Sequence, residues 1–258
     1  TAQDFMRVDP FPLRLKPGFE PKRTNVRRLA PKYMEKVREE IQELLKEGII
    51  LPYEGPVASP IVVIEKPDQS IRLCVDYKVW LNEATEIIQF PLPNIHDMLS
   101  RLRGKKYYAV LDLTRGFHQI KINEEDQYLT AFITLFGTFK FTRIPFGVSN
   151  GPTYFQLCMT KVLNELLGVA CEVFIDDICV YGTSAEEFEA NLQQVFQRLK
   201  EYNILLKPEK CKIGLTEIVY LGFMLNQDGI KLYAENILSR LGILFEFHAW
   251  RNKLIGQG

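Results

Sequence analysis

The chain carries two adjacent aspartates, Asp176 and Asp177, inside an otherwise apolar stretch, CEVFIDDICVY at residues 171–181. Apolar, β-favouring residues on both sides predict a strand, a tight turn and a second strand, with both carboxylates at the turn. Two like charges side by side in an apolar hairpin repel each other, and a divalent cation would remove that cost. Hard oxygen ligands suit Mg²⁺ or Mn²⁺, and two-metal sites catalyse phosphoryl and nucleotidyl transfer. An exposed polar turn is the alternative that this pair alone leaves open.

A third carboxylate lies in a matching setting. Asp112 ends the apolar run YYAVL at residues 107–111, and the residues Thr114, Arg115 and Gly116 then break the strand. An acid in a buried strand is costly unless it is paired or bound to a metal ion. Its alternative role is that of a strand-end residue capping the next turn. Two strands that both end in carboxylates nevertheless favour one shared metal cluster.

The composition bounds the class of protein. With 258 residues and 47% apolar content, the chain can bury a sizeable core in one large domain or two lobes. No apolar run reaches membrane-spanning length and no signal-peptide pattern opens the chain, so we expect no membrane partner. Five dispersed cysteines indicate reduced thiols in an intracellular protein and argue against a structural zinc site. The 32 basic and 32 acidic residues argue mildly against nucleic-acid binding through bulk charge, although a cleft can be basic locally.

The first 30 residues contain several prolines and little periodicity, which predicts an extended arm. Basic residues dominate residues 14–32, against the single acid Glu20. They are Arg14, Lys16, Lys22, Arg23, Arg27, Arg28 and Lys32. A solvated arm is the simpler interpretation, and a strap along the phosphates of a template is the functional one.

Periodicity and punctuation predict the elements that follow. A helix begins at Pro31 and stops at Gly48, and two β-rich runs, 61–64 and 71–75, form a hairpin with a polar tip. A short helix follows at 95–102, a second hairpin within 128–141, and a helix capped by Ser149 or Asn150 that runs to about residue 167. Apolar residues at helical spacing over 185–199 predict a core-packing helix, and residues 220–225 predict a last strand. This order indicates an α+β fold with an antiparallel sheet and helices on one face.

Together these segments resemble the reverse transcriptase domain of gypsy-type LTR retrotransposons. The resemblance covers about residues 31–230 in the family's order and spacing. It is carried by five motifs: IRLCVDY at 71–77, LDLTRGFHQI at 111–120, IPFGVSNGP at 144–152, FIDD at 174–177 and YLGF at 220–223.

The resemblance implies a right-hand polymerase fold with fingers and palm subdomains and an antiparallel palm sheet backed by helices. The implied fingers are residues 31–90 and 120–148, after the arm at 1–30. The implied palm is residues 91–119 and 149–232, which include the primer grip. Residues 233–258 form a divergent tail with no recognisable thumb or RNase H domain, as in a fragment of a Pol polyprotein.

The implied activity is that of an RNA-directed DNA polymerase, in which a primer 3′-hydroxyl attacks the α-phosphate of a deoxynucleoside triphosphate. Asp112 and Asp176 would bridge two Mg²⁺ ions, with Mn²⁺ as the alternative, and Asp177 would be the weaker third acid. The main-chain carbonyl of Leu113 would complete one metal site. Lys210 matches a lysine that protonates the leaving pyrophosphate, and a solvated loop lysine is its alternative.

The resemblance also implies the nucleotide and primer sites. Lys66 and Arg72 would clamp the triphosphate, and Arg115 and Gly116 would offer backbone N–H groups to it. Phe117 would lie under the sugar and exclude a 2′-hydroxyl, although a core phenylalanine is its ordinary role. The remaining implied residues are Phe146, which lines the same pocket, and the primer grip Tyr220, Leu221, Gly222 and Phe223.

Two departures from the family pattern affect the fingers. The link at residues 76–82, around Trp80, has one residue more than usual, and Pro67 stands where a basic residue is common. Both predict looser fingers. Together with the neutral charge, the missing thumb motivates a second hypothesis: a catalytically silent, nucleic-acid-binding or scaffold protein from a truncated or domesticated element. Another palm-type nucleotidyl transferase or cyclase is a third, which the fingers and primer-grip motifs disfavour.

The partners expected from the resemblance are an RNA or DNA template with its primer and deoxynucleoside triphosphates. The chain is also expected to act with the remainder of a Pol polyprotein or as an oligomer. Its location is expected to be intracellular, either in a cytoplasmic virus-like particle or in the nucleus.

Overall fold

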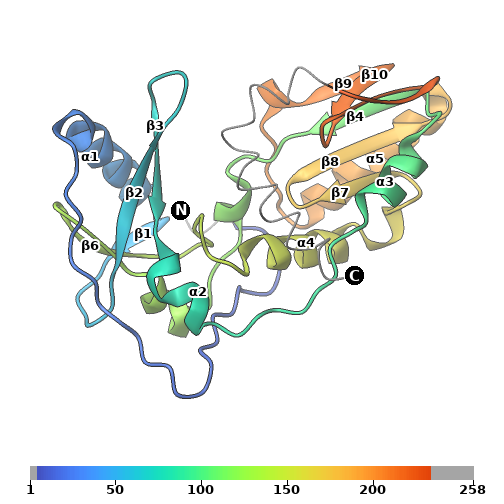
Figure 1. Ribbon diagram of the computed structural model, residues 1–258. Coiled ribbons are helices and arrows are strands. Elements are labelled where there is room, and N and C mark those ends of the chain that lie inside the picture. The colour runs from blue at the N-terminus through green and yellow to red at the C-terminus, as the bar shows by residue number, and fades with distance from the viewer. Residues whose placement is uncertain (1–4, 234–258) are drawn as a thin grey trace.

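A computed structural model describes residues 5–233 of the chain. Helices and strands form two lobes, with one sheet on the left and another on the right of Figure 1. The left lobe contains a five-stranded sheet of order β1-β6-β5-β2-β3, and the right lobe a four-stranded sheet of order β7-β8-β4-β9. A third sheet, β10-β11-β12, adjoins the right lobe. The predicted α+β class is therefore confirmed.

The left lobe has the features predicted for fingers. Its strands are β1 (Ile50–Pro52), β2 (Ser59–Glu65), β3 (Ile71–Val75), β5 (Phe132–Thr134) and β6 (Gly137–Phe141). The helix α1 (Pro31–Lys46) buries Val37, Ile41 and Leu44, as its apolar spacing predicts. The helix ends before Gly48, whose φ of 69° suits glycine at a helix C-terminus. The hairpin of β2 and β3 pairs Ile61 with Val75 and Glu65 with Ile71, as predicted.

The segment with the inserted residue near Trp80 is packed into this lobe. Trp80 is buried between a short 3₁₀ turn (Tyr77–Val79) and the helix α2 (Leu81–Ala84), and its indole N–H donates to Ser59 Oγ at 3.0 Å. Tyr77 is also buried, and its hydroxyl donates to the carbonyl of Thr130 at 2.8 Å. The link that carries the extra residue therefore contributes two side chains to the core, and looser fingers stay a prediction.

The right lobe has the features predicted for a palm. Its central strand β4 (Tyr107–Leu111) pairs with β8 (Asp177–Gly182) on one side and with β9 (Lys212–Leu215) on the other. At the edge lies β7 (Cys171–Phe174). The helices α4 (Gly151–Val162) and α5 (Ala185–Glu201) bury residues in the main core together with Ala109 and Leu111 of β4.

A third helix covers the opposite face of the palm sheet. The helix α3 (Ile95–Leu102) packs in a second core with Tyr108, Cys179 and Tyr181, which point away from the main core because side chains alternate along a strand. The prediction that helices cover one face of the sheet therefore holds for α4 and α5. It does not hold for α3, which covers the other face together with the third sheet. Its N-terminus is capped by Asn94, whose side chain accepts from the backbone N–H groups of His96 and Asp97.

Three local predictions were wrong at least in part. The helix α4 ends at Val162, before a 3₁₀ turn (Asn164–Leu166), and Asn150 occupies its N-cap position without a side-chain capping hydrogen bond. The Asn150 amide instead accepts from the Ile88 N–H and donates to the Glu86 carbonyl, which fixes the connector before α3. The basic part of the arm is solvated as predicted, with Arg14, Arg23 and Arg28 exposed, but the preceding part is packed. There Met6, Phe11 and Leu13 are buried, and Phe11 stacks edge-on against Tyr154 at 5.2 Å between ring centroids.

The third error concerns residues 220–225, which form a hairpin rather than one strand. β10 (Glu217–Tyr220) and β11 (Phe223–Asn226) pair antiparallel, and β12 (Gly229–Leu232) follows. Leu221 and Gly222 both have positive φ, at 51° and 85°, which is the backbone of a tight two-residue hairpin turn. The predicted tail lies almost entirely outside the described residues. Within residues 5–233, no helix has the length and apolar character that crossing a membrane requires.

Candidate active site

The three predicted catalytic carboxylates lie at the same end of the palm sheet. Leu111 of β4 pairs with Ile178 of the antiparallel strand β8. Asp112, which follows Leu111, therefore lies beside Asp177, which precedes Ile178. Asp176 occupies the two-residue turn between β7 and β8, where Phe174 pairs with Asp177. Gly116 closes in from the loop after β4, because a Cβ built on it would lie 3.4 Å from Asp176 Cβ. The strands thus bring the loop of residues 112–116 against the aspartate turn.

The aspartate turn is strained and is held by a buried amide. Ile175 has φ of 58°, a left-handed conformation that is unusual for a β-branched residue. Its backbone N–H donates to Gln156 Oε1 at 2.6 Å, and Gln156 Nε2 donates to the Val173 carbonyl at 3.3 Å. Gln156 is fully buried on α4. The sequence analysis missed this residue, whose only signal is a glutamine among the apolar positions of a predicted core helix.

The electrostatic environment favours binding of a cation between Asp112 and Asp176. Asp176 is accessible to solvent but lies against Gly116, and partial loss of hydration raises its pKa. The negative charge of Asp112 raises the pKa of Asp176 further, whereas a hydrogen bond from its own backbone lowers it. Asp112 and Asp176 are therefore close enough to repel each other, and a divalent cation would relieve that repulsion.

The donor set fits a cation that takes its other ligands from water and substrate. Across residues 5–233, no three His, Cys, Asp or Glu side chains converge to hold a metal ion by themselves. Asp177 is therefore not gathered with Asp112 and Asp176 into a three-carboxylate cage. Mg²⁺ commonly uses one or two carboxylates, several waters and substrate phosphates, and the pair Asp112 and Asp176 meets that requirement.

A second strand segment fixes the loop that follows Asp112. Leu113 and Leu206 form an antiparallel bridge, in which the Lys207 N–H donates to the Asp112 carbonyl at 2.8 Å and the Thr114 N–H to the Leu205 carbonyl at 3.0 Å. Both hydrogen bonds use the neighbours of Leu113, so the Leu113 carbonyl, the predicted metal ligand, takes part in neither. Gln119 adds side-chain bonds to the same two segments and is a further residue that the sequence analysis missed.

Four of the predicted nucleotide residues form a continuous wall beside the loop. The Arg72 guanidinium lies over the Phe146 ring at 5.7 Å from its centroid. Phe146 contacts Phe117 edge-on at 5.5 Å, and Phe117 contacts the core residue Phe155 at 5.2 Å between ring centroids. Phe155 also lies against Gly116. The wall therefore runs from the β2–β3 hairpin to the aspartate turn, and its role in nucleotide binding stays a prediction.

A buried histidine supports this wall from behind. The His118 ring lies 5.3 Å from the Phe146 ring and 6.1 Å from the Phe141 ring between centroids. Neither ring nitrogen of His118 has a hydrogen-bond partner. Burial lowers the pKa of His118 to about 4, and the positive charges of Arg115 and Arg143 act in the same direction. The ring is therefore neutral at physiological pH.

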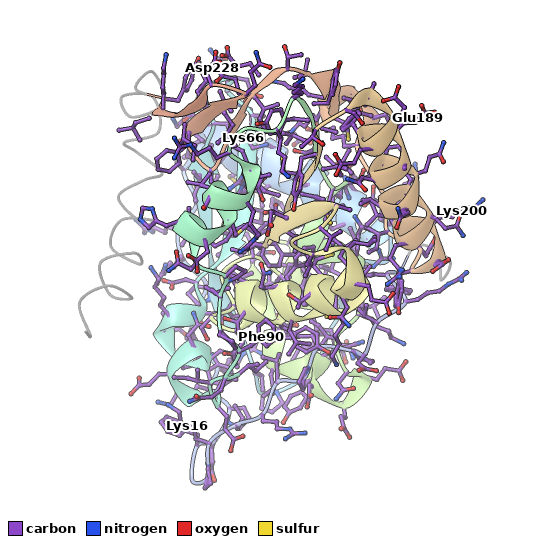
Figure 2. The ribbon with its side chains drawn as sticks, turned by 90° about the vertical axis from the view of Figure 1, so that its right-hand side faces the viewer. Lys16, Lys66, Phe90, Glu189, Lys200 and Asp228 are labelled. Atoms are coloured by element: carbon purple, nitrogen blue, oxygen red, sulfur yellow. The ribbon has the colours of Figure 1, made fainter. Side chains whose placement is uncertain are left out.

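The other predicted site residues, Lys66, Lys210 and the primer grip, have fewer contacts with the aspartates than the nucleotide wall and the loop after Asp112 have. Lys66 is exposed at the tip of the β2–β3 hairpin, and Figure 2 shows it at the end of the molecule away from Lys16. Lys210 is exposed in a 3₁₀ turn, and its neighbour Cys211 has its Sγ 3.4 Å from the Asp112 backbone nitrogen. The predicted primer-grip residues Tyr220–Phe223 form the β10–β11 turn, and the Tyr220 hydroxyl donates to the Asp177 carbonyl at 2.9 Å.

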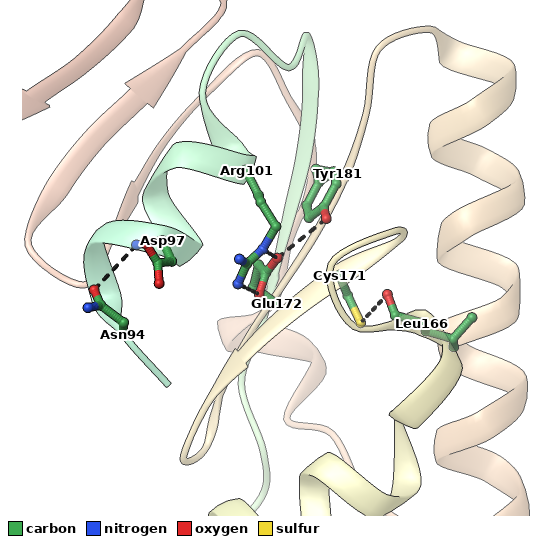
Figure 3. Close-up of polar contacts among 7 residues, drawn as sticks. All are labelled: Asn94, Asp97, Arg101, Leu166, Cys171, Glu172 and Tyr181. Carbon is green, nitrogen blue, oxygen red and sulfur yellow. Dashed lines mark hydrogen bonds and ion pairs between the residues drawn. The ribbon is translucent and has the colours of Figure 1, made fainter. Parts of the chain in front are cut away.

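An ion pair anchors the strand that leads into the aspartate turn. Arg101 on α3 bonds both carboxylate oxygens of Glu172 on β7, at 2.6 and 3.1 Å, and the Tyr181 hydroxyl lies 3.5 Å from the same carboxylate (Figure 3). The Glu172 side chain is only 5% exposed, whereas Arg101 is 43% exposed. This contact joins α3 to the hairpin that carries Asp176.

Comparison with known proteins decides the family. The sequence profile described as "Reverse transcriptase (RNA-dependent DNA polymerase)" matches residues 64–225, more than half of the chain. This chain belongs to the reverse transcriptase family. The matched range contains both strands of the aspartate hairpin and the loop after β4. Reverse transcriptases as a family use divalent metal ions, which agrees with the carboxylate pair of this domain.

Curated relatives of this reverse transcriptase domain are retrotransposon polyproteins. It is 38% identical over 208 residues to the Pol polyprotein from transposon 297 of Drosophila melanogaster, which covers 79% of the chain and 20% of the relative. It is 40% identical over 200 residues to that from transposon opus of the same fly, covering 76% of the chain and 20% of the relative. These matches confirm the resemblance to LTR retrotransposons, and the chain spans about one fifth of these relatives.

Solved structures confirm the polymerase fold of this reverse transcriptase domain. The foamy viral protease–reverse transcriptase in complex with an RNA/DNA hybrid superposes with a TM-score of 0.81 at 26% identity, covering 90% of this chain and 31% of that chain. A form of the same protein in complex with double-stranded DNA gives 0.80 at 26% identity, covering 90% and 40%. The division into fingers and palm at the exact boundaries predicted above stays a prediction.

Proposed function

We propose that this domain is the catalytic core of an RNA-directed DNA polymerase that adds deoxynucleotides to a primer 3′-end. The observation that carries the proposal is the meeting of Asp112 and Asp176 at the end of the palm sheet, beside the wall of Arg72, Phe146 and Phe117. The two carboxylates suit cations, and the wall offers a guanidinium for phosphates and aromatic rings for a sugar. The likeness to foamy viral structures that hold nucleic-acid duplexes supports a template–primer partner.

Each residue has a role in the proposed reaction. Asp112 and Asp176 would hold divalent cations, which when bound lower the pKa of the primer hydroxyl and neutralise the departing pyrophosphate. Arg72 orients the triphosphate, and the backbone of Arg115 and Gly116 faces its oxygens. Phe117 fills the space under the sugar and so excludes a 2′-hydroxyl. Lys210 supplies a proton to the pyrophosphate.

The primer is proposed to lie against the turn of residues Tyr220–Phe223. That turn is tied to the catalytic hairpin through the hydrogen bond of Tyr220 to the Asp177 carbonyl. A primer end resting on it is therefore placed in register with the strand that carries Asp177. Deoxynucleoside triphosphates as substrates, and partner domains of a longer polyprotein, belong to this proposal as well.

Primer extension tests the proposal directly. Purified protein is given a DNA primer on an RNA template, deoxynucleoside triphosphates and Mg²⁺, with Asp176→Asn as the matched inactive control. The proposal expects extension by the unaltered chain and a loss on the order of 10³-fold or more in the variant, because removing a metal-binding charge costs several kcal/mol of transition-state stabilisation. Extension by neither protein, with duplex binding intact, would instead support the silent binding or scaffold protein.

A further inference from the structure

Arg115 joins the catalytic loop to the fingers helix. Its guanidinium Nη2 lies 2.9 Å from Glu43 Oε1, and its Nη1 pairs with Glu47 Oε2. Glu43 lies on α1, and Glu47 directly follows that helix. Arg115 lies between Asp112 and Phe117, in the loop proposed to receive the triphosphate. A cation of the nucleotide site is therefore held by two carboxylates of the other lobe.

The two carboxylates belong to an acidic stripe formed by α1 and its C-cap residue. Glu40, Glu43 and Glu47 recur at helical spacing on one face. Burial and the charge of Glu43 raise the pKa of Glu40, whereas the charges of Arg115 and Lys66 lower it. Arg115 and Lys66, both proposed to meet the triphosphate, therefore face this stripe. Negative charge at a helix C-terminus is unfavourable, so Arg115 offsets a cost that the helix itself carries.

The side chain of Arg115 can change partners without any change in its backbone, because it reaches solvent beside the nucleotide loop. Arg115 has φ of 48°, and the following residue, Gly116, packs against Asp176 and Phe155. The side chains of Arg115 and Glu47 are 39% and 40% exposed. Exposed ion pairs of this kind contribute little to stability and exchange readily. A triphosphate offers a guanidinium denser negative charge than two separate carboxylates.

We propose that Glu43 and Glu47 set the affinity for the incoming nucleoside triphosphate by competing with it for Arg115. The inference rests on the proposed function. Without nucleotide, the two carboxylates hold the guanidinium and tie the loop to α1. When a triphosphate binds, the guanidinium moves to the phosphates, and the nucleotide must overcome the lost ion pairs. Glu43 and Glu47 are thus positioning residues, which act through Arg115.

The test is nucleotide binding to a complex of the protein with a chain-terminated primer on its template, so that no chemistry occurs. The double variant Glu43→Gln, Glu47→Gln keeps the side-chain shapes and removes the competing charges. Its Kd for the complementary deoxynucleoside triphosphate should fall about three- to tenfold. Arg115→Ala should raise the Kd, and adding both glutamine substitutions to Arg115→Ala should then change nothing.

The matched control is Glu35→Gln, Glu39→Gln, which removes the same charge from exposed positions of the same helix. It should leave the Kd unchanged, and melting temperatures establish that every variant is folded. An unchanged Kd in the Glu43 and Glu47 variant would overturn the inference. An equal fall in the control or in the Arg115→Ala background would also overturn it, because the effect would then be one of general charge. Nucleotide binding by none of the proteins would overturn the proposed function as well.

Discussion

Gln119 bonds both backbone groups of Leu205: its Oε1 accepts from the Leu205 N–H at 2.8 Å, and its Nε2 donates to the Leu205 carbonyl at 2.9 Å. The same Nε2 donates to the Thr114 carbonyl at 2.6 Å. The buried Gln119 side chain thus supplies the backbone hydrogen bonds that a neighbouring strand would otherwise make, at the point where the chain leaves the sheet. This amide fixes the loop after Asp112 to the segment that leads to Lys210.

Replacing Gln119 by methionine should therefore destabilise the protein by about 2–4 kcal/mol. The substitution keeps the volume but leaves two part-buried backbone groups, the Thr114 carbonyl and the Leu205 N–H, without their side-chain partner, at about 1–3 kcal/mol for each group. Urea unfolding followed by circular dichroism measures the loss. Gln127→Met is the control, because Gln127 is also buried but makes one long hydrogen bond, of 3.4 Å to the Ile122 carbonyl. Equal losses in the two variants would contradict the special role of Gln119.

Phe117→Val should increase the use of ribonucleotides relative to deoxynucleotides. Phe117 is only partly buried and stands between Phe146 and Phe155 in the nucleotide wall, so a smaller side chain opens space beside the sugar. Relief of such a clash is worth a few kcal/mol, roughly 10²-fold in the ratio of kcat/KM values. Phe132→Val, in the fingers core, should cost stability and leave the ratio unaltered. If the folded Phe117→Val protein kept the same ratio of kcat/KM values for ribonucleotides and deoxynucleotides, Phe117 would have only a packing role.

Stability should fall as the pH is lowered from about 6.5 to about 4, and His118 should account for part of that fall. The pKa of His118 is lowered from 6.5 to about 4 in the folded chain, so the unfolded chain binds the extra proton in this window. The contribution is complete above pH 6.5 and is lost by about 1 kcal/mol per pH unit below it. His118→Phe should flatten that part of the curve of unfolding free energy against pH. Substituting the exposed His96 by glutamine should not, and an identical slope in both variants would exclude His118 as the source.

Arg101→Met should destabilise the palm far more than Glu172→Gln. Loss of Arg101 leaves the almost fully buried Glu172 carboxylate without its bidentate partner, which costs about 3–5 kcal/mol. Loss of the Glu172 charge leaves an arginine that already reaches solvent, at about 1 kcal/mol. Figure 3 shows Glu172 between Arg101 and Tyr181. Thermal unfolding of both variants measures the two losses of stability, and equal shifts would contradict the burial argument.

Local signals were sufficient to predict the catalytic hairpin. Alternating apolar strands around Asp176 and Asp177, and the break after Asp112, specify strands and turns through residues that are neighbours in the chain. The same approach failed at Leu221, because an apolar residue with positive φ does not look like a turn. It also failed for Phe11 and Leu13, whose burial depends on other parts of the fold rather than on any period of their own.

Long-range partners explain what else the sequence could not predict. The amide of Gln119 meets Leu205 across 86 residues, and Arg115 meets Glu43 across 72. No periodic pattern in the sequence indicates either contact, because both form only when elements distant in the chain pack together. Gln156 is similar: its helical position predicts burial, but its partner is set by where the aspartate turn comes to lie.

The place of β4 in the sheet has a consequence for synthesis on the ribosome. This strand has neighbours on both sides, yet β8 ends at Gly182 and β9 begins only at Lys212. At about 5–20 residues per second, the nascent chain spends roughly 4 to 14 s between completing β4 and completing β8. Throughout that interval a five-residue apolar strand has both edges unpaired. The strand that delivers Asp112 is thus open to incorrect pairing until β8 has been synthesised.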